Sequence, residues 1–505
     1  MAYSYLRPNR NQPLLLPPDI RDWLPEDHLV WFVLEVVSMV DLAQFHKRHP
    51  NDGVGRRAYD PEMMLALLVY AYCTGTRSSR RIAAGCRTDL AMKVICCDVV
   101  PEHDAIGRFR ANHEEAIKGA FTDVLMLCAR IGLTSLGIVA IDGTKIGSDA
   151  ALDANRNESA ILAEVERILA EAKASDELDA SQPALAGNVP EVPVRPAGRL
   201  ARLQAALGEI RTERETRRKQ EEARTTRLAE EAAQGRRPRG SAPKDPARAL
   251  GRAQADLEAA KVRKRNARTT PAELQATEEI QRAKRSLCAA AKAAQAAPAP
   301  AEPQANTTDP ESRIMKSASG WVQGYNAQAA VNEHQVVLAA VVTTDANDVG
   351  QLLPMITAVE NNAATAHISG PVGIVLADAG YWSVGNATTP GPDRLIATAK
   401  DWKQRRAARE MGTTTGPAPE GASALETMEH RLRTEAGAAQ YAKRSYTVEP
   451  IFGQIKENRN MRRFMRRGLD AASSEWSLIC ATTNILKMFV HADGRALAGL
   501  LLPEL

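Results

Sequence analysis

The sequence predicts a mixed α+β protein with an all-helical N-terminal part and an α/β core that is interrupted by a long helical insertion. Apolar residues recur every three or four positions before residue 131, which is typical of helices. Short apolar runs of strand length follow at residues 136–141 and 373–377, and an Ala-, Glu- and Arg-rich stretch lies between them at residues 150–318. With 505 residues, 44% of them hydrophobic, the chain can bury the cores of about two to four domains.

The N-terminal part is justified by helical spacing and by a capping signal. One predicted helical face carries Leu29, Phe32, Val33, Val36 and Val37, and Asp60-Pro61 is a typical start for a helix that contains the apolar run 63–73. Short helices and interspersed arginines fit a helix-turn-helix-like DNA-binding domain at residues 1–132, with Arg77, Arg80, Arg81, Arg108 and Arg110 as DNA contacts. An ordinary helical domain with solvated arginines fits the same residues.

The α/β core is predicted at residues 133–150 and 319–490, with a C-terminal tail at 491–505. The apolar run 136–141 predicts a buried strand that ends at Asp142, and the run 373–377 predicts another that ends at Asp378. Two further strands flank Asn332-Glu333 as a hairpin, and a helix is expected from Asn347 to Val359.

The insertion is assigned to residues 151–318. Helices are expected at about 156–179, 199–234 and 247–294, separated by Pro-rich linkers at 183–196 and 238–246. The heptad spacing predicts a partial coiled coil, because the apolar seam of Leu200, Leu203, Leu207 and Ile210 turns polar at Arg214. Solvated helices explain its basic residues as well as DNA contact does.

Charge is distributed unevenly although the formal net charge is only +4. Residues 1–141 carry 16 basic and 16 acidic side chains, whereas residues 201–300 carry 23 against 13 and residues 441–470 carry 8 against 3. Two basic zones in a balanced chain indicate a polyanionic partner such as nucleic acid.

Several protein classes are excluded by composition. The longest apolar run has 11 residues, fewer than the roughly 18 that a membrane span needs, so we expect a cytoplasmic protein without a membrane partner. The 7 cysteines form no Cys-x-x-Cys pair, which argues against a disulfide framework and a zinc site.

Three acidic residues stand at positions suited to a metal site. Asp142 and Asp378 follow the two strand runs, and Glu449 precedes Pro450 at the start of an expected helix. Three converging carboxylates make an all-oxygen site for Mg²⁺, and two such ions could activate a water or a 3′-hydroxyl and stabilise the leaving oxygen of a phosphodiester. Taken singly, each acid has a simpler explanation as a turn residue, a strand end or a helix N-terminus.

Five arginines follow Glu449 at helical spacing. If their segment is helical, they form one face without an acid among them, which would favour a bound polyanion: Arg459, Arg462, Arg463, Arg466 and Arg467. The alternative is a solvated face whose arginines pair with acids from elsewhere in the chain.

Three motifs resemble the catalytic boxes of bacterial insertion-sequence transposases of the DDE class. They are Asp142-Gly143-Thr144-Lys145, Asp378-Ala379-Gly380-Tyr381-Trp382-Ser383, and Tyr441-Ala442-Lys443-Arg444 followed by residues 448–456. The resemblance implies a ribonuclease H-like core in which Asp142, Asp378 and Glu449 hold two Mg²⁺ ions, with Mn²⁺ as a substitute. Family members cut the 3′ ends of their element at its terminal inverted repeats and join them to target DNA by in-line phosphoryl transfer.

The same resemblance implies DNA contacts by Tyr441, Arg444, Lys456 and Lys145, and a homodimer or higher assembly on double-stranded DNA in the bacterial nucleoid. Four residues separate Arg444 from Glu449, where the commonest form of the motif has three, so Lys443 or Ser445 could take its place. A catalytically silent, transposon-derived DNA-binding protein and a scaffold built on the insertion are the alternatives.

Overall fold

The computed structural model describes residues 19–47, 58–97, 99–181, 196–238, 243–298, 301–317, 320–399, 406, 410 and 412–501. The linker predicted at 183–196 lies outside these ranges except for Pro196. The chain divides into two compact units, one of residues 1–154 and 311–505 and the other of residues 155–310. Among the helices within the described ranges, none has both the length and the apolarity to cross a membrane.

The first unit begins with helices, as the sequence predicts. They are η1 (Ile20–Trp23), α1 (Leu29–Ser38), α2 (Ala43–His46), α3 (Pro61–Cys73), α4 (Ser79–Thr88), α5 (Leu90–Cys96), α6 (His103–Asn112) and α7 (Glu114–Arg130). The predicted start of α3 is confirmed, because the Asp60 side chain accepts the N–H of Met63 and Pro61 occupies the first turn. On α1, the predicted face is buried from Phe32 to Val37.

A six-stranded mixed sheet forms the core of this unit. Its strands are β1 (Ile138–Gly147), β4 (Arg313–Ser317), β5 (Gly320–Asn332), β6 (Val337–Thr343), β7 (Ile374–Ala377) and β8 (Asp393–Ile396). The order is β4-β5-β1-β7-β8, and β6 pairs with β5 as the predicted hairpin. Strand β1 runs antiparallel to β5 and parallel to β7. Strand β4 belongs to this sheet although it lies within residues 151–318.

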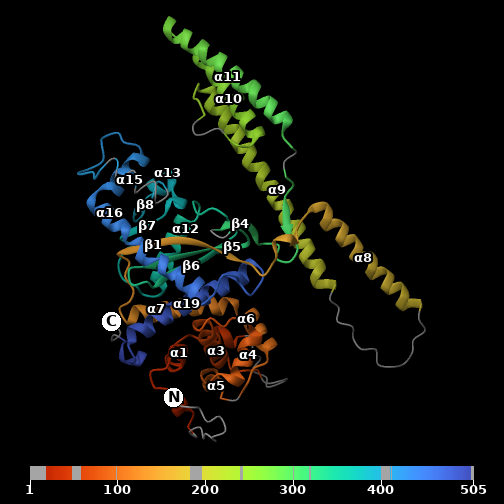
Figure 1. Ribbon diagram of the computed structural model, residues 1–505, viewed down its shortest axis with the longest axis vertical. Coiled ribbons are helices and arrows are strands. Elements are labelled where there is room, and N and C mark those ends of the chain that lie inside the picture. The colour runs from red at the N-terminus through yellow and green to blue at the C-terminus, as the bar shows by residue number, and fades with distance from the viewer. Residues whose placement is uncertain are drawn as a thin grey trace, which may run out of the picture. The chain divides into compact units, whose positions relative to one another are not determined.

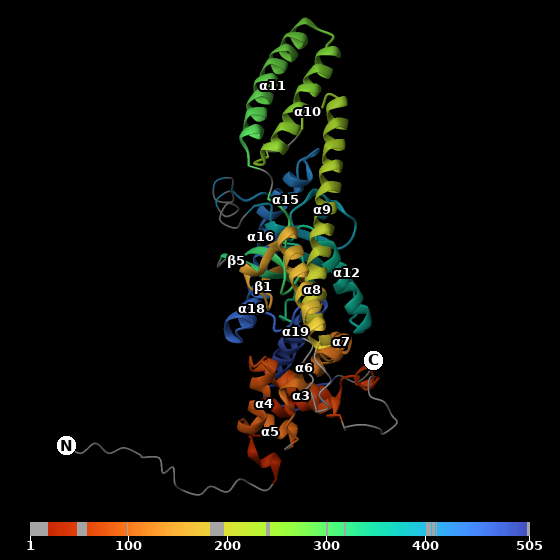
Figure 2. The same cartoon turned by 90° about the vertical axis from the view of Figure 1, so that its right-hand side faces the viewer.

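The remaining elements cover the sheet and carry the C-terminal motifs. They are α12 (Leu352–Thr365), η3 (Ala379–Tyr381), α13 (Val384–Thr388), α15 (Ala424–Arg433), α16 (Glu435–Ala442), α17 (Arg444–Thr447), α18 (Glu449–Gly453), η4 (Gln454–Asn458), α19 (Leu469–Ala492) and η5 (Leu497–Gly499). Helix α19 packs against β6 on one side and against α3 and α7 on the other (Figures 1 and 2). It therefore joins the sheet and the N-terminal helices into one core.

A buried polar network ties α19 to the N-terminal helices. Glu475 on α19 accepts hydrogen bonds from the Tyr72 hydroxyl at 3.1 Å and from the Met465 N–H at 2.8 Å. Arg110 donates to the same Tyr72 hydroxyl at 3.1 Å, and Arg77 lies 3.9 Å from the Glu475 carboxylate. Because buried charges are tolerated only when they are paired, this network fixes the N-terminal helices against the core.

The second unit is a set of long helices closed by a short ribbon. Strands β2 (Asn155–Asn157) and β3 (Gln304–Asn306) pair, and between them lie α8 (Glu158–Ser181), α9 (Pro196–Ala233), α10 (Pro246–Arg265) and α11 (Thr270–Ala296). Helices α10 and α11 lie side by side (Figures 1 and 2). The single helix expected at 247–294 is therefore wrong, because the chain turns at Asn266 and restarts at the first-turn Pro271.

The predicted apolar seam is partly used within the second unit. Leu203, Leu207 and Ile210 are buried against Ile161 of α8. The seam stops where Arg214 pairs with Glu158 at 2.6 Å, in keeping with the predicted change to polar residues. A coiled coil in this unit stays a prediction.

Candidate active site

Asp142 lies inside strand β1 and does not end it as predicted. Strand β5 pairs with β1 as far as Gly147, whereas β7 pairs with it only up to Ile141. The predicted strand end was wrong because β5 supplies a partner for six further residues of β1, Asp142 to Gly147. Asp142 is thus the first residue beyond the last pair of β1 with β7.

Asp378 and Glu449 occupy the element ends that the sequence predicts. Asp378 directly follows β7, whose last residue Ala377 is paired with Ile141, so both aspartates lie one step beyond the same pair. The Asp378 carboxylate accepts the N–H of Gly380 at 2.8 Å. Glu449 begins α18 with Pro450 in the first turn, and its side chain is half exposed.

Arg444 joins two of the three carboxylates. Its guanidinium donates to Asp142 Oδ2 at 2.6 Å and to Glu449 Oε1 at 3.0 Å, and its side chain is only 9% exposed. The Ser445 hydroxyl instead donates to the Ala442 carbonyl at 2.9 Å. Despite the longer spacing to Glu449, Arg444 is therefore the residue in contact with the acidic positions.

Crowded acids surround Asp142. Burial raises the pKa of Asp142 to about 7; Arg444 opposes the rise, and the nearby Asp378 and Asp348 add to it. Burial disfavours the charge of Arg444, but its carboxylate neighbours, Asp142 above all, outweigh burial and raise its pKa. The site thus holds more negative charge than one guanidinium compensates.

The motif lysines and tyrosine lie beside this cluster. The Lys456 ammonium donates to the Lys145 carbonyl at 3.1 Å, and burial, followed by the charge of Arg462, lowers the pKa of Lys456. Tyr441, near the end of α16, is half-buried and close enough to Arg444 to influence its pKa. The structure therefore brings together Lys145, Lys456, Arg444 and Tyr441.

A fourth carboxylate, Asp348, lies at the site and was not predicted from the sequence. It lies in the loop between β6 and α12, and its Oδ1 accepts hydrogen bonds from Asn326 at 2.7 Å, from Gln328 at 2.9 Å and from the Lys145 ammonium at 3.1 Å. The signal that identified Asp142 and Asp378, an acid shortly after an apolar strand run, is also present here after the run 336–343.

The predicted arginine face does not exist, because residues 459–467 are not helical. The π-turn η4 ends at Asn458, Asn460 has a φ of 52°, and the Phe464 N–H bonds to the Gly147 carbonyl beside β1 at 2.7 Å. This segment, residues 459–467, is called the arginine loop below.

The arginines of this loop have partners within the chain. Arg459 is buried and donates to Thr482 at 2.9 Å and to Thr483. The other four pair with acids: Arg462 with Glu457, Arg463 and Arg467 with Asp149, and Arg466 with Glu114. The alternative explanation, pairing with acids from elsewhere in the chain, describes Arg463, Arg466 and Arg467, whereas Arg462 pairs with the nearby Glu457. The side chains of Arg462, Arg463 and Arg467 remain about half exposed.

The N-terminal arginines fall into two groups. Arg110 is buried and also bonds to the Arg77 carbonyl at 3.0 Å, while Arg77 donates to the carbonyls of Asn460, at 2.9 Å, and Arg463. Both therefore hold the arginine loop in place within the fold. Of the predicted DNA contacts in this part of the chain, Arg80 and Arg81 on α4 and Arg108 on α6 are exposed.

The donor set determines which metal would suit the site. Within the described ranges, no three His, Cys, Asp or Glu side chains are grouped so as to hold a metal ion. Arg444 lies between Asp142 and Glu449. The acids nevertheless offer only carboxylate oxygens, which Mg²⁺ prefers, and a divalent cation would relieve the charge crowding at Asp142.

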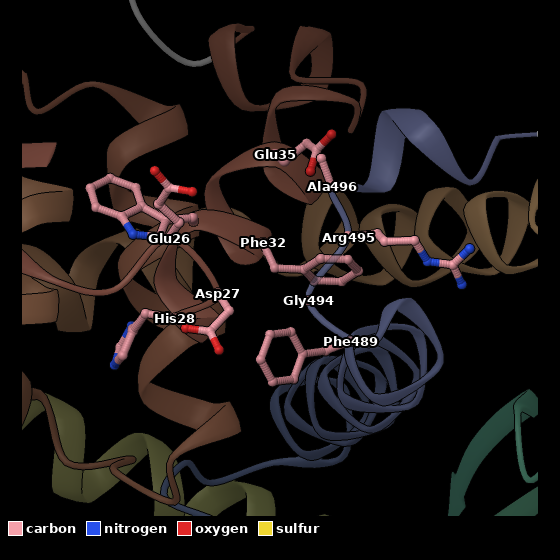
Figure 3. A pocket seen from close by; sticks show the side chains of 10 residues that line it. Glu26, Asp27, His28, Phe32, Glu35, Phe489, Gly494, Arg495 and Ala496 are labelled. Atoms are coloured by element: carbon pink, nitrogen blue, oxygen red, sulfur yellow. The ribbon is translucent and has the colours of Figure 1, made fainter.

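A separate pocket opens beside α1 and the end of α19 (Figure 3). Trp31, Phe32 and Phe489 supply aromatic walls, and Glu35 is among its acids. Glu35 accepts the N–H groups of Leu497 and Ala498, each at 2.7 Å, so it anchors the C-terminal segment. The pocket thus lies where residues 26–35 contact residues 489–496.

Comparisons with known proteins identify two regions. Residues 18–112 match the model of a transposase domain (DUF772), and residues 402–489 match the model of a transposase DDE domain. The second match contains Tyr441, Arg444, Glu449 and Lys456, whereas Asp142 and Asp378 lie outside both matches. Neither a curated protein nor a solved structure matches the chain.

Proposed function

Because the two matched domains support an insertion-sequence DDE transposase, we propose that the chain binds the terminal inverted repeats of its element and catalyses DNA cleavage and strand transfer. The observation that supports the proposal is that two motif acids lie one step beyond the same strand pair, and that Arg444 links one of them to the third. Asp142 in β1 and Asp378 after β7 flank one strand pair, and Glu449 is linked to Asp142 through Arg444.

Asp142, Asp378 and Glu449 would hold Mg²⁺, two ions in all, with Mn²⁺ as a substitute. Bound there, the metal would activate the attacking water or 3′-hydroxyl and stabilise the leaving oxygen. The protein's own part is to supply the oxygen ligands from a strand, a strand end and a helix start, so that they are held by the packed core.

The cationic residues beside the acids would hold the DNA backbone. The Lys456 ammonium donates to the Lys145 carbonyl of β1, and Arg444, which has Tyr441 close by, contacts Asp142. Lysine and arginine donors suit phosphate oxygens and add affinity that falls with salt. Further contacts would come from the exposed or half-exposed arginines, which are Arg80, Arg81, Arg108, Arg462, Arg463 and Arg467. The more buried Arg77, Arg110, Arg459 and Arg466 have partners within the fold.

The domain roles follow from this assignment. Residues 1–132 would recognise DNA, residues 133–150 and 319–490 would form the ribonuclease H-like catalytic domain, and the helical insertion at 151–318 would grip DNA or join protomers. A homodimer or higher assembly on double-stranded DNA in the nucleoid would bring two element ends together.

The test uses the purified full chain and DNA that carries the terminal sequences flanking its gene. We expect Mg²⁺-dependent nicking and joining that Asp142→Asn, Asp378→Asn and Glu449→Gln abolish while their thermal unfolding remains cooperative. DNA binding without any nicking by the unaltered protein would instead support the catalytically silent DNA-binding protein. Undiminished cleavage by folded triad variants would show that the acids are assigned wrongly.

A further inference from the structure

We propose that Asp348 is a positioning residue that fixes the Lys145 ammonium beside the catalytic carboxylates. The proposal rests on the transposase function proposed above. It starts from the contact between the two side chains, which are 3.1 Å apart at Nζ and Oδ1. Both are shielded, with 13% of the Lys145 side chain and 23% of the Asp348 side chain exposed.

Asp348 is itself held from two sides. Asn326 and Gln328, neighbours on one face of β5, both donate to its Oδ1, and Gln328 also donates to the Asn326 side chain at 3.0 Å. The Tyr381 hydroxyl, in the turn that follows Asp378, donates to the side-chain Oε1 of Gln328. This chain of bonds connects Asp348 with the turn that carries Asp378, so its carboxylate has one defined place.

Two glycines make room for Asp348 at the site. A Cβ on Gly143 would lie 2.8 Å from Asp348 Oδ1 and 2.2 Å from Gln328 Nε2. A Cβ on Gly380 would lie 3.4 Å from Asp348 Oδ2 and 3.0 Å from Asp378 Oδ1. The glycine after Asp142 thus allows Asp348 and Gln328 to approach the backbone of β1 closely, and it does not form the turn that is common for an Asp-Gly pair.

The position of Lys145 is fixed at both ends. The Lys145 carbonyl accepts a hydrogen bond from the Lys456 ammonium, and the Lys145 ammonium binds Asp348. Lys456 is thereby held beside the stretch of β1 that carries Lys145. A lysine left free has three rotatable donors on a long flexible stem. Held by Asp348, the Lys145 ammonium meets a DNA phosphate without first being ordered, which favours the cleavage step more than binding.

The test is a double-variant cycle of Asp348→Asn and Lys145→Gln in the full chain. Asparagine is nearly isosteric with aspartate, and its oxygen can still accept from Asn326 and Gln328, so we expect Asp348→Asn to fold. Glu360→Gln, which removes a negative charge from an exposed position on α12, is the matched control. Single-turnover cleavage, DNA affinity at several salt concentrations and Mg²⁺ titrations are measured for each protein.

We expect Asp348→Asn to slow single-turnover cleavage about tenfold to a hundredfold, because the Lys145 ammonium loses the negative charge that holds it in place. DNA affinity should stay equal or tighten through the loss of a negative charge. Lys145→Gln should slow cleavage and also weaken binding, with a salt slope lower by about one unit. In the Lys145→Gln background, Asp348→Asn should add nothing to the loss of rate.

Three results would overturn the proposal. The first is a cleavage rate of the double variant that is reduced by the product of the two single-variant effects, because the two residues would then act independently. The second is a raised Mg²⁺ requirement of Asp348→Asn, which would make Asp348 a metal ligand. The third is loss of DNA affinity with an unchanged rate for the bound DNA. Inactivity of the unaltered protein would instead count against the proposed transposase function, so the two failures can be told apart.

Discussion

Replacing Glu475 with alanine should strongly destabilise the first unit, because this buried carboxylate joins α19 to the N-terminal helices. The side chain is 2% exposed, and its removal leaves the Tyr72 hydroxyl and the Met465 N–H without their acceptor. It also leaves the buried Arg110 and the nearby Arg77 without a carboxylate. Breaking a buried charge pair from one side costs about 3–5 kcal/mol.

The assay is urea unfolding of the full chain, followed by tryptophan fluorescence, since Trp476 adjoins the altered residue and is fully buried. Asp470→Ala is the matched control on the same helix, because its side chain is 87% exposed and its ion pair with Lys118 is long, 3.9 Å. We expect the control to change the unfolding free energy by less than about 0.5 kcal/mol. A loss below about 1 kcal/mol for Glu475→Ala would refute the role given to the network.

Three further predictions concern charge at the site. The first concerns EDTA-treated protein, in which the pKa of Asp142 is raised to about 7, whereas its pKa in the unfolded chain is about 4. The protonated side chain therefore adds its full contribution to the free energy of unfolding below about pH 4, and this contribution is lost as the pH rises through 7. Urea midpoints of Asp142→Asn should therefore fall less than those of the unaltered protein between pH 5 and 8, and parallel curves would contradict this. Arg444→Ala removes the interaction that lowers the pKa of Asp142, so the pH profile of cleavage should move to higher pH, whereas Lys443→Ala should leave it in place. Arg462→Ala should lower the salt slope of DNA binding by about one unit, and a slope equal to that of the unaltered protein would refute a contact between Arg462 and a phosphate. Arg466→Ala breaks the pair with Glu114 and should instead lower the melting temperature.

Local signals predicted much of the fold. Capping at Asp60, the hairpin around Asn332 and the strand before Asp378 depend on neighbours in sequence, and the structure has each of them. The length of β1 could not be predicted, because residues 142–147 are extended through pairing with β5, far away in the chain. Tertiary partners decide such cases, and periodicity does not reveal them.

The site shows the same limit. The sequence indicated Asp142, Asp378 and Glu449 by their predicted places at element ends, although Asp142 lies inside β1, and it predicted a helical face from the spacing of the five arginines. The prediction of a helix for the arginine loop was wrong. Its 3–4 spacing fits a helix, but its backbone bonds to β1 and its side chains pair with Asp149 and Glu114. Asp348 was overlooked because its importance depends on Lys145, Asn326 and Gln328, which lie on two other strands.

The chain leaves the first unit after β1 and returns to it before β4, and both of these strands pair with β5. Gly147, near the exit, is paired with Gly324, which is also paired with Arg313 just after the return. All six strands of the sheet lie outside residues 155–310. We therefore expect that a short peptide, or a foreign domain whose two ends lie close together, can replace residues 155–310 without changing the order of the strands.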